Sequence, residues 1–160
     1  MTEHAAVAKL KEKFSSSVLD VVVHRGETSV TVKKDDIVAI CSFVKKSLGF
    51  NLLCDVCGID YLGQSPRFMM VYNLYNISTK EYLRLKTPVE ESDARIDTVS
   101  VVWGTANWLE RECWDLMGIS FNNHPDLRRI LMPDDWEGHP LRKDYPLQGP
   151  GREPYQGRIS

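Results

Sequence analysis

Apolar and polar positions over the first 118 residues follow two different periods, which predicts a mixture of helices and strands. Apolar residues recur three or four positions apart over 5–14, 37–48 and 100–118, the spacing of helices with one buried face. Runs of β-branched and aromatic residues predict strands at 18–24, 29–32, 51–56, 67–77 and 81–87. The last two strands flank a short polar turn and form the expected antiparallel pair.

The second and third predicted helices carry recognisable end signals. Asp35 or Asp36 can cap the start of the second helix, because an aspartate side chain accepts hydrogen bonds from free backbone N–H groups. Gly49 suits the end of that helix, and Gly118 suits the end of the third, since glycine adopts the left-handed conformation without strain. The pattern therefore predicts a compact domain that ends at residue 118.

The third predicted helix is unusually rich in tryptophan. Trp103, Trp108 and Trp114 lie within 100–118 and, together with the apolar stripe, leave hardly any purely polar face. A helix that is apolar around most of its circumference is usually buried. We therefore expect something outside the domain to cover part of this helix.

The last third of the chain changes character after Gly118. Six of the eight prolines lie there, which disfavours a long helix. A disordered tail would be depleted in large apolar side chains, yet this segment contains many of them. They are Phe121, Leu127, Ile130, Leu131, Met132, Trp136, Leu141, Tyr145 and Leu147. The sequence thus predicts an extended, ordered C-terminal arm over 119–160, lying on its own domain or on a partner.

The composition is that of a globular domain of 160 residues, with 42% hydrophobic and 26% charged side chains. The net charge of −2 gives no argument for binding nucleic acid or an anionic membrane surface. No uncharged stretch approaches the roughly 18 residues needed for a transmembrane segment. The first residues lack the pattern of a signal peptide, so we expect the chain to stay in the cytoplasm.

Cysteines and histidines offer only weak metal-site candidates. Cys54 and Cys57 form a lone CxxC pair, whereas zinc and iron–sulfur sites usually need three or four ligands, so a structural role is favoured for all four cysteines. His124 and His139 each precede a proline and could bind zinc with nearby carboxylates. A stand-alone metal-dependent hydrolase using these two histidines is therefore an alternative. The favoured interpretation is that each His-Pro pair makes an extended bend, followed by bases that donate to carboxylates on a neighbouring surface.

The densest charge cluster is Glu110-Arg111-Glu112, followed by Asp115. Glu112 and Asp115 are spaced to share a helical face, and Arg111 can pair with Asp115 one turn on. Two close carboxylates are compatible with acid–base catalysis, but they also suit a charged strip at an interface. Neither a phosphate-binding loop nor a GxSxG motif occurs in the sequence. An ion-pair network at an interface is the favoured interpretation.

This cluster and the tail that follows it resemble a known family. Residues 110–119, then 121–131 and 132–147, are similar to the signature of the 30-kDa subunit family of respiratory complex I, whose bacterial members are the C subunits of NADH-quinone oxidoreductase. The shared elements are Glu-Arg-Glu, an acid three residues on, two apolar residues, and then a histidine, a base and two aliphatic residues. Weaker similarity extends upstream to about residue 50.

The resemblance implies an α+β fold, in which a mixed sheet with helices packed on one side is followed by an extended proline-rich C-terminal arm. It implies a structural subunit in the peripheral arm of a proton-translocating NADH:quinone oxidoreductase, which passes electrons from NADH through FMN and iron–sulfur clusters to quinone. Those cofactors are carried by partner subunits, and this chain is expected to bind none. The equivalent subunit of a membrane-bound hydrogenase or ferredoxin-linked complex is an alternative.

The resemblance also implies a location and a set of contacts. The chain would lie on the cytoplasmic side of the bacterial inner membrane, where the quinone-site and iron–sulfur subunits hold it. Its compact domain over 1–118 would carry an arm over 119–160 that packs on these partners. The signature residues expected at the subunit interface are Glu110, Arg111, Glu112, Asp115, His124, Arg128, Arg129, His139, Arg142, Lys143 and Asp144.

Overall fold

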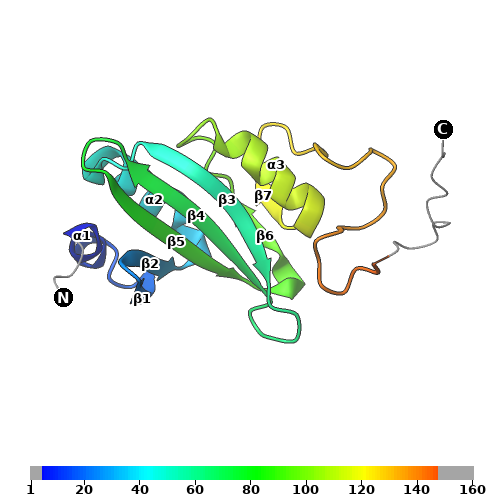
Figure 1. Cartoon of the computed structure of the whole chain (residues 1–160), viewed down its shortest axis with the longest axis horizontal. Helices are drawn as coiled ribbons and strands as arrows, with labels where there is room; N and C mark the ends of the chain where they lie inside the picture. Colours follow the sequence, from blue (N-terminus) through cyan, green and yellow to red (C-terminus); the bar gives the residue numbers. More distant parts are fainter. Residues whose placement is uncertain (1–4, 148–160) are drawn as a thin grey trace.

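A five-stranded mixed sheet forms the centre of the computed structural model, which describes residues 5–147 (Figure 1). Its strands lie in the order β1-β2-β5-β4-β3. β2 and β5 pair in parallel, and the other neighbours pair antiparallel. The strand bounds are β1 (Val18–His24), β2 (Glu27–Val32), β3 (Leu52–Asp60), β4 (Phe68–Asn76) and β5 (Glu81–Val89).

Three α-helices and a small second sheet complete the described part of the fold. The helices are α1 (Ala5–Lys13), α2 (Ile37–Leu48) and α3 (Ala106–Met117), with single 3-10 turns η1 (Lys34–Asp36) and η2 (Glu91–Asp93). The short strands β6 (Arg95–Asp97) and β7 (Ser120–Asn122) pair in parallel on either side of α3 in the sequence. This pairing returns the chain after α3 to the segment that precedes the helix.

The helices pack on one face of the five-stranded sheet, which confirms the expected α+β architecture. Alternate side chains of β4, such as Met70 and Tyr72, are fully buried beneath them. Ile40 of α2 belongs to the same core, and the Cys113 sulfur of α3 lies 3.7 Å from the Met70 sulfur. Figure 1 shows α2 behind the sheet and α3 beside β3. The opposite face is more exposed, as at Tyr82 of β5.

The predicted strands and the first two predicted helices are confirmed with small shifts of their ends, but the third helix begins later than expected. It starts at Ala106 rather than at Ser100. The chain before it turns tightly, and the N–H of Trp103 donates to the carbonyl of Val99 at 3.0 Å. The N–H of Val99 in turn donates to the carboxylate of Glu110 at 2.7 Å. These contacts hold the preceding segment outside the helix.

The predicted glycine ends are confirmed, whereas the predicted aspartate cap is wrong. Gly49 and Gly118 end α2 and α3 with φ angles of 81° and 73°, in the left-handed region. Asp36 occupies the N-cap position of α2, but its side chain makes no capping bond. Its carboxylate instead accepts a hydrogen bond from the Ser17 hydroxyl at 2.5 Å, which joins α2 to the segment before β1.

The tryptophans around α3 have unequal surroundings. Trp103 precedes the helix and is buried, Trp114 is half-buried, and Trp108 is 62% exposed. The expectation that something else covers this region therefore concerns Trp108 above all. Within the described residues, no helix is long and apolar enough to cross a membrane.

The C-terminal arm runs around the C-terminal end of α3 as far as it is described (Figure 1). Its first residues belong to the compact part, because Ile119 and Phe121 are buried in the core. Residues 123–147 then continue without a helix or strand. The expected domain boundary after residue 118 stays a prediction, and positions 148–160 of the expected arm lie outside the described residues.

Candidate functional site

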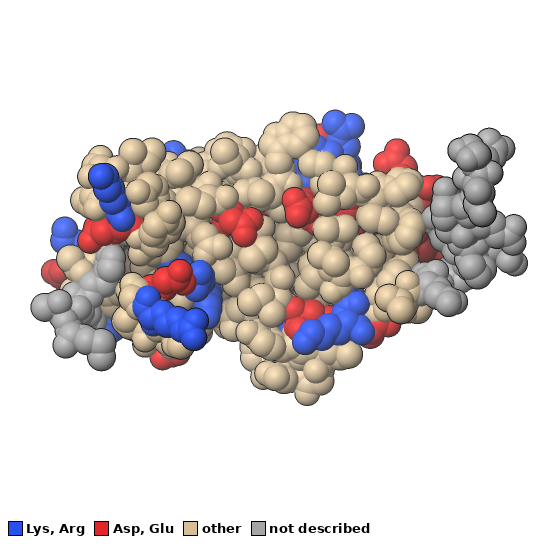
Figure 2. Space-filling view, in the orientation of Figure 1, with Lys and Arg blue, Asp and Glu red and all other residues tan. Residues whose placement is uncertain are grey.

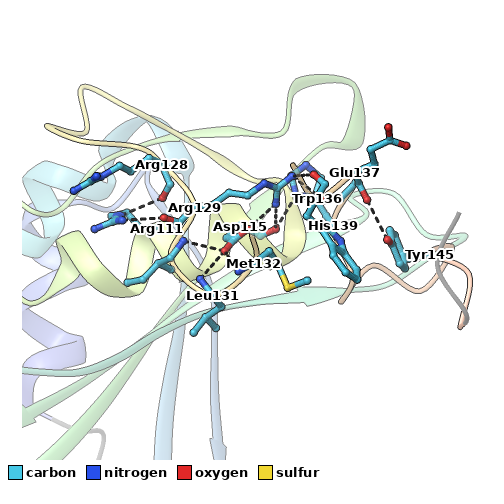
Figure 3. Close-up of polar contacts among 12 residues, drawn as sticks. Arg111, Asp115, Arg128, Arg129, Leu131, Met132, Trp136, Glu137, His139 and Tyr145 are labelled. Carbon is cyan, nitrogen blue, oxygen red and sulfur yellow. Dashed lines mark hydrogen bonds and ion pairs between the residues drawn. The ribbon is translucent and has the colours of Figure 1, made fainter. Parts of the chain in front are cut away.

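Asp115 organises the contact between α3 and the arm (Figure 3). Its side chain is fully buried, and one carboxylate oxygen, Oδ2, accepts the backbone N–H groups of Ile130, Leu131 and Met132 at 3.0, 2.8 and 2.9 Å. The other oxygen accepts a bond of 2.6 Å from Arg129. Burial by itself would raise the pKa of Asp115, but these donors lower it to about 2. The carboxylate is therefore ionised at neutral pH and holds three consecutive residues of the arm.

Arg129 extends this contact to a second stretch of the arm. While one Nη atom bonds Asp115, the other donates to the carbonyls of Trp136 and Gly138 at 2.8 and 3.2 Å. The guanidinium also lies over the Trp114 ring, 5.8 Å from its centroid. One side chain thus joins α3 to two separate turns of the arm, a geometry that the planar guanidinium fork makes possible.

The arm also caps the C-terminal end of α3. The last carbonyls of a helix have no partner within it, and here the arm supplies donors. His139 Nδ1 lies 2.9 Å from the Asp115 carbonyl, the N–H of Leu141 donates to Leu116 at 2.9 Å, and Arg142 Nε donates to Met117 at 2.7 Å. Partial burial lowers the pKa of His139, which favours a neutral ring that donates from Nδ1.

Arg111 holds the arm through its backbone, and the expected Arg111–Asp115 ion pair is wrong. Arg111 is buried and donates to the carbonyls of Arg128 and Arg129 at 3.1 and 2.9 Å. Its guanidinium lies 5.2 Å from the centroid of the Trp108 ring. The pair does not form because the folded arm brings other donors to Asp115, and the same fold offers carbonyls to Arg111.

Glu112 and Asp115 have different surroundings, which argues against the alternative of a paired acid–base site. Asp115 is fully buried under the arm, whereas Glu112 is exposed. The three-residue spacing places the two side chains near each other on an isolated helix, but the arm covers only one of them. The structure thus supports no paired acid–base site here.

Glu110 is a second buried carboxylate, in the N-terminal half of α3. It accepts hydrogen bonds from the Thr98 hydroxyl and from the N–H of Val99, and it lies 3.8 Å from Nε2 of His124. His124 Nε2 lies 3.0 Å from the Asn107 carbonyl. Burial raises the pKa of Glu110 to about 7, which outweighs the opposite effect of the two hydrogen bonds.

The raised pKa of Glu110 predicts that the free energy of unfolding falls as the pH rises. The unfolded chain loses this proton near pH 4.5 and the folded chain near pH 7, so stability falls by about 3 kcal/mol as the pH rises between these values. Below that window the cost is absent. The Glu110→Gln variant keeps a donor and an acceptor and should not show this fall when urea unfolding is measured from pH 4.5 to 8. Parallel pH profiles for the two proteins would contradict the prediction.

The remaining signature residues fall into two groups. Arg128 is exposed and pairs with Asp126 at 2.9 Å, away from Asp115. Lys143 and Asp144 lie at a separate place, where the Lys143 N–H donates to Asp60 at 2.8 Å and Asp144 pairs with Arg67. Asp60 and Arg67 were not among the predicted site residues. Their contacts with the arm could not be expected from the local pattern, because Arg67 stands 77 positions from Asp144 and Asp60 stands 83 positions from Lys143.

The metal-site alternative receives no geometric support from the described residues. Within 5–147, no group of three or more histidine, cysteine, aspartate or glutamate side chains is arranged to hold a metal ion. His124 and His139 contact different backbone carbonyls, those of Asn107 and Asp115. Cys54 is exposed on the sheet edge, so the CxxC pair does not form an enclosed site.

Many polar groups of the arm form hydrogen bonds within the chain, while several of its leucines are exposed. Leu131 and Leu141 are each 59% exposed, and Leu147 is fully exposed. On the face shown in Figure 2, acidic and basic side chains lie in small, separate groups, without a field of one sign. Three exposed leucines thus lie along an arm whose neighbouring backbone is bonded to α3 at Leu131 and Leu141.

Comparison with known proteins identifies the family. The family model described as "Respiratory-chain NADH dehydrogenase, 30 Kd subunit" matches residues 30–151. The NADH-quinone oxidoreductase C subunit of Geobacter metallireducens is 69% identical over 156 residues, which cover 97% of this chain and 96% of that protein. The equivalent protein of Geobacter sulfurreducens is 67% identical with the same coverage, and that of Roseiflexus sp. is 43% identical over 141 residues, which cover 87% of this chain and 81% of that protein.

Two solved structures share the fold. A trypsin-resistant fragment of Nqo5 superposes with a TM-score of 0.68 and 30% identity, covering 76% of this chain and 99% of the fragment. A chain of the membrane-bound sulfane sulfur reductase, an archaeal respiratory membrane complex, superposes with a TM-score of 0.76 and 25% identity, covering 88% of this chain and 84% of that chain. With the matched family model and the high identity to the Geobacter proteins, these findings confirm the expected resemblance: the chain belongs to the family of the 30-kDa subunit of respiratory-chain NADH dehydrogenase.

Proposed function

We propose that this chain is a non-catalytic subunit of the peripheral arm of a proton-translocating NADH:quinone oxidoreductase and that its C-terminal arm docks it to companion subunits. The observation that carries the proposal is that the polar groups of the arm are bonded within the chain while its leucines stay exposed. Asp115, Arg129 and Arg142 engage its polar groups inside the chain, while Leu141 and Leu147 remain exposed. An apolar surface held in one conformation binds a partner with little loss of conformational entropy.

The docking surface consists of Leu131, Leu141 and Leu147. Burying a leucine side chain contributes about 1.5–3 kcal/mol, so three of them add substantially to a subunit interface. In this proposal the signature side chains act at the interface indirectly, by fixing the arm that carries the leucines. Arg128 and Glu112 are exposed, unlike the buried Asp115, and can contact a partner directly.

The companions proposed for this surface are the quinone-site and iron–sulfur subunits of the complex. FMN and the iron–sulfur clusters would be carried by them, and NADH and quinone would react there. The chain would then be a peripheral membrane protein on the cytoplasmic side of the inner membrane, held by its neighbours. The family membership and the names of the NADH-quinone oxidoreductase relatives support this proposal.

A related complex is the second candidate. The similarity to a chain of the archaeal membrane-bound sulfane sulfur reductase indicates that this fold also occurs in another respiratory membrane complex. The equivalent role in a membrane-bound hydrogenase or ferredoxin-linked complex is therefore tested alongside the first. The identity of the co-purifying subunits distinguishes the candidates, because an NADH- and FMN-binding subunit is expected only in the first.

Affinity purification of the tagged chain from its native host in mild detergent tests the proposal. We expect co-purification of other NADH:quinone oxidoreductase subunits, and at least a tenfold loss of them with Leu141→Asp/Leu147→Asp. Ile77→Asp is the matched control, since Ile77 is also exposed but lies after β4, at the other end of the sheet from Asp60. A monomeric chain without partners, or equal recovery with all variants, would contradict the proposal.

A further inference from the structure

Arg67 is an almost completely buried guanidinium immediately before β4, only 3% exposed. It makes two bidentate ion pairs. Nε and Nη2 donate to the two oxygens of Asp60, both at 2.9 Å. Nη1 and Nη2 donate to the two oxygens of Asp144 at 3.0 and 2.8 Å. Nη1 also bonds Glu91 at 2.5 Å.

These bonds join three segments that are distant in the sequence. Asp60 ends β3, Glu91 begins the 3-10 turn η2 after β5, and Asp144 belongs to the arm. Asp60 also accepts the backbone N–H of Lys143 at 2.8 Å. Two consecutive residues of the arm are therefore held at the same place, one through its backbone and one through its side chain.

The ionisation of Arg67, Asp60 and Asp144 favours these contacts with the arm. The hydrogen bonds from Arg67 lower the pKa of both Asp60 and Asp144, and the same bonds raise the pKa of Arg67. All three groups are therefore charged at neutral pH. Detachment of the arm would break both bonds between Arg67 and Asp144 and would remove the Lys143 N–H from Asp60, while Arg67 would stay paired with Asp60 and Glu91.

A second contact fixes the arm immediately before this point. Leu141 and Arg142 bond the carbonyls of Leu116 and Met117 at the end of α3. The guanidiniums of Arg142 and Arg67 lie 5.3 and 5.0 Å from the centroid of the Phe68 ring. The arm is thus held to α3 through 141 and 142 and to the sheet through 143 and 144.

We infer that Arg67 is a positioning residue for subunit docking: it bonds Asp144 of the arm and orients Asp60, which accepts the Lys143 N–H, and so fixes the direction in which Leu141 and Leu147 face a partner. The inference rests on the proposed docking function. It adds Arg67, a residue beside the sheet that is far in the sequence from the leucines of the docking surface. Arginine is required because three carboxylates are bonded by three different nitrogens. Lysine would keep the charge but lose the fork.

The test combines a measurement on the isolated full-length chain with the affinity purification. Asp144→Asn removes the charge of a half-exposed side chain, and Arg67→Lys removes the fork. In both variants we expect hydrogen exchange at the Lys143 amide to be at least tenfold faster and recovery of companion subunits to fall at least threefold. For Asp144→Asn the melting temperature should stay within about 2 °C of the wild type. Arg84→Lys is the control, because this β5 arginine pairs with Glu27 and has no contact with the arm among the described residues.

The outcomes separate this inference from the proposed function. Unchanged exchange at Lys143 in Asp144→Asn would overturn the inference, and so would faster exchange with full recovery of companions. If the wild-type chain recovers no companions, the proposed function fails, whatever the variants show. Faster exchange and reduced recovery in Asp144→Asn and Arg67→Lys, with Arg84→Lys like the wild type, would establish Arg67 as a positioning residue.

Discussion

Replacing Asp115 with alanine is expected to release the middle of the arm from α3. The change leaves the N–H groups of Ile130, Leu131 and Met132 without their acceptor and removes the only carboxylate partner that the described residues give Arg129. Breaking a buried, hydrogen-bonded charge pair from one side costs about 3–5 kcal/mol. We expect the amides of residues 130–132 to exchange with solvent at least a hundredfold faster, as measured by hydrogen exchange at neutral pH.

The matched control for this prediction is Glu112→Ala on the same helix. Glu112 is an exposed carboxylate, so its loss should change exchange in the arm by less than twofold. The wild-type contribution of Asp115 also has a defined pH window. Because its folded pKa is lowered to about 2, the contribution is present above pH 4 and is lost as the pH falls toward 2. Equal exchange rates in Asp115→Ala and Glu112→Ala would refute the role assigned to Asp115.

Replacing Gly118 with alanine is expected to displace the arm from the end of α3. A methyl group at this position would lie 2.4 Å from Cδ2 of His139 and 2.6 Å from Nη2 of Arg142, and the backbone φ of 73° is unfavourable for alanine. The combined strain and loss of capping should lower the free energy of unfolding by about 2–4 kcal/mol. Trypsin should cleave after Arg142 and Lys143 several times faster, as followed by mass spectrometry.

Gly49→Ala separates backbone strain from arm displacement. Gly49 ends α2 with a similar φ of 81°, and a methyl group there would lie 2.9 Å from the side chain of Asn76, not from the arm. We expect this variant to lower the stability while leaving cleavage after Arg142 and Lys143 at the wild-type rate. If both variants accelerate the cleavage equally, the contact of Gly118 with the arm has no specific effect.

Local rules of the sequence predicted the elements well but failed for the contacts of α3. Hydrophobic periodicity located the five strands of the main sheet and the first two helices but missed β6 and β7, and Gly118 marked the end of α3. The four-residue spacing of Arg111 and Asp115 predicted an ion pair, which is the correct expectation for an isolated helix. In the folded chain, residues 128–132 approach the same helix and offer better partners to both side chains.

The start of α3 failed for a similar reason. The apolar pattern continues upstream to Ser100, so periodicity alone extends the helix. In the structure the Glu110 carboxylate accepts a hydrogen bond from the N–H of Val99. This contact holds the preceding segment in a turn, and the helix begins only at Ala106. The sequence pattern also does not indicate that Glu110 is the buried glutamate of the charge cluster.

The sequence by itself determined the alternation of helices and strands, the left-handed end of α3 and the family, because each depends on residues close together in the chain. Only the tertiary structure decided which groups meet at the arm. Asp115 meets Ile130–Met132, and Arg67 meets Asp144 across 77 positions. Such pairs are selected by how the arm packs on α3 and the sheet, and the charges of the separate segments are compatible with many other pairings.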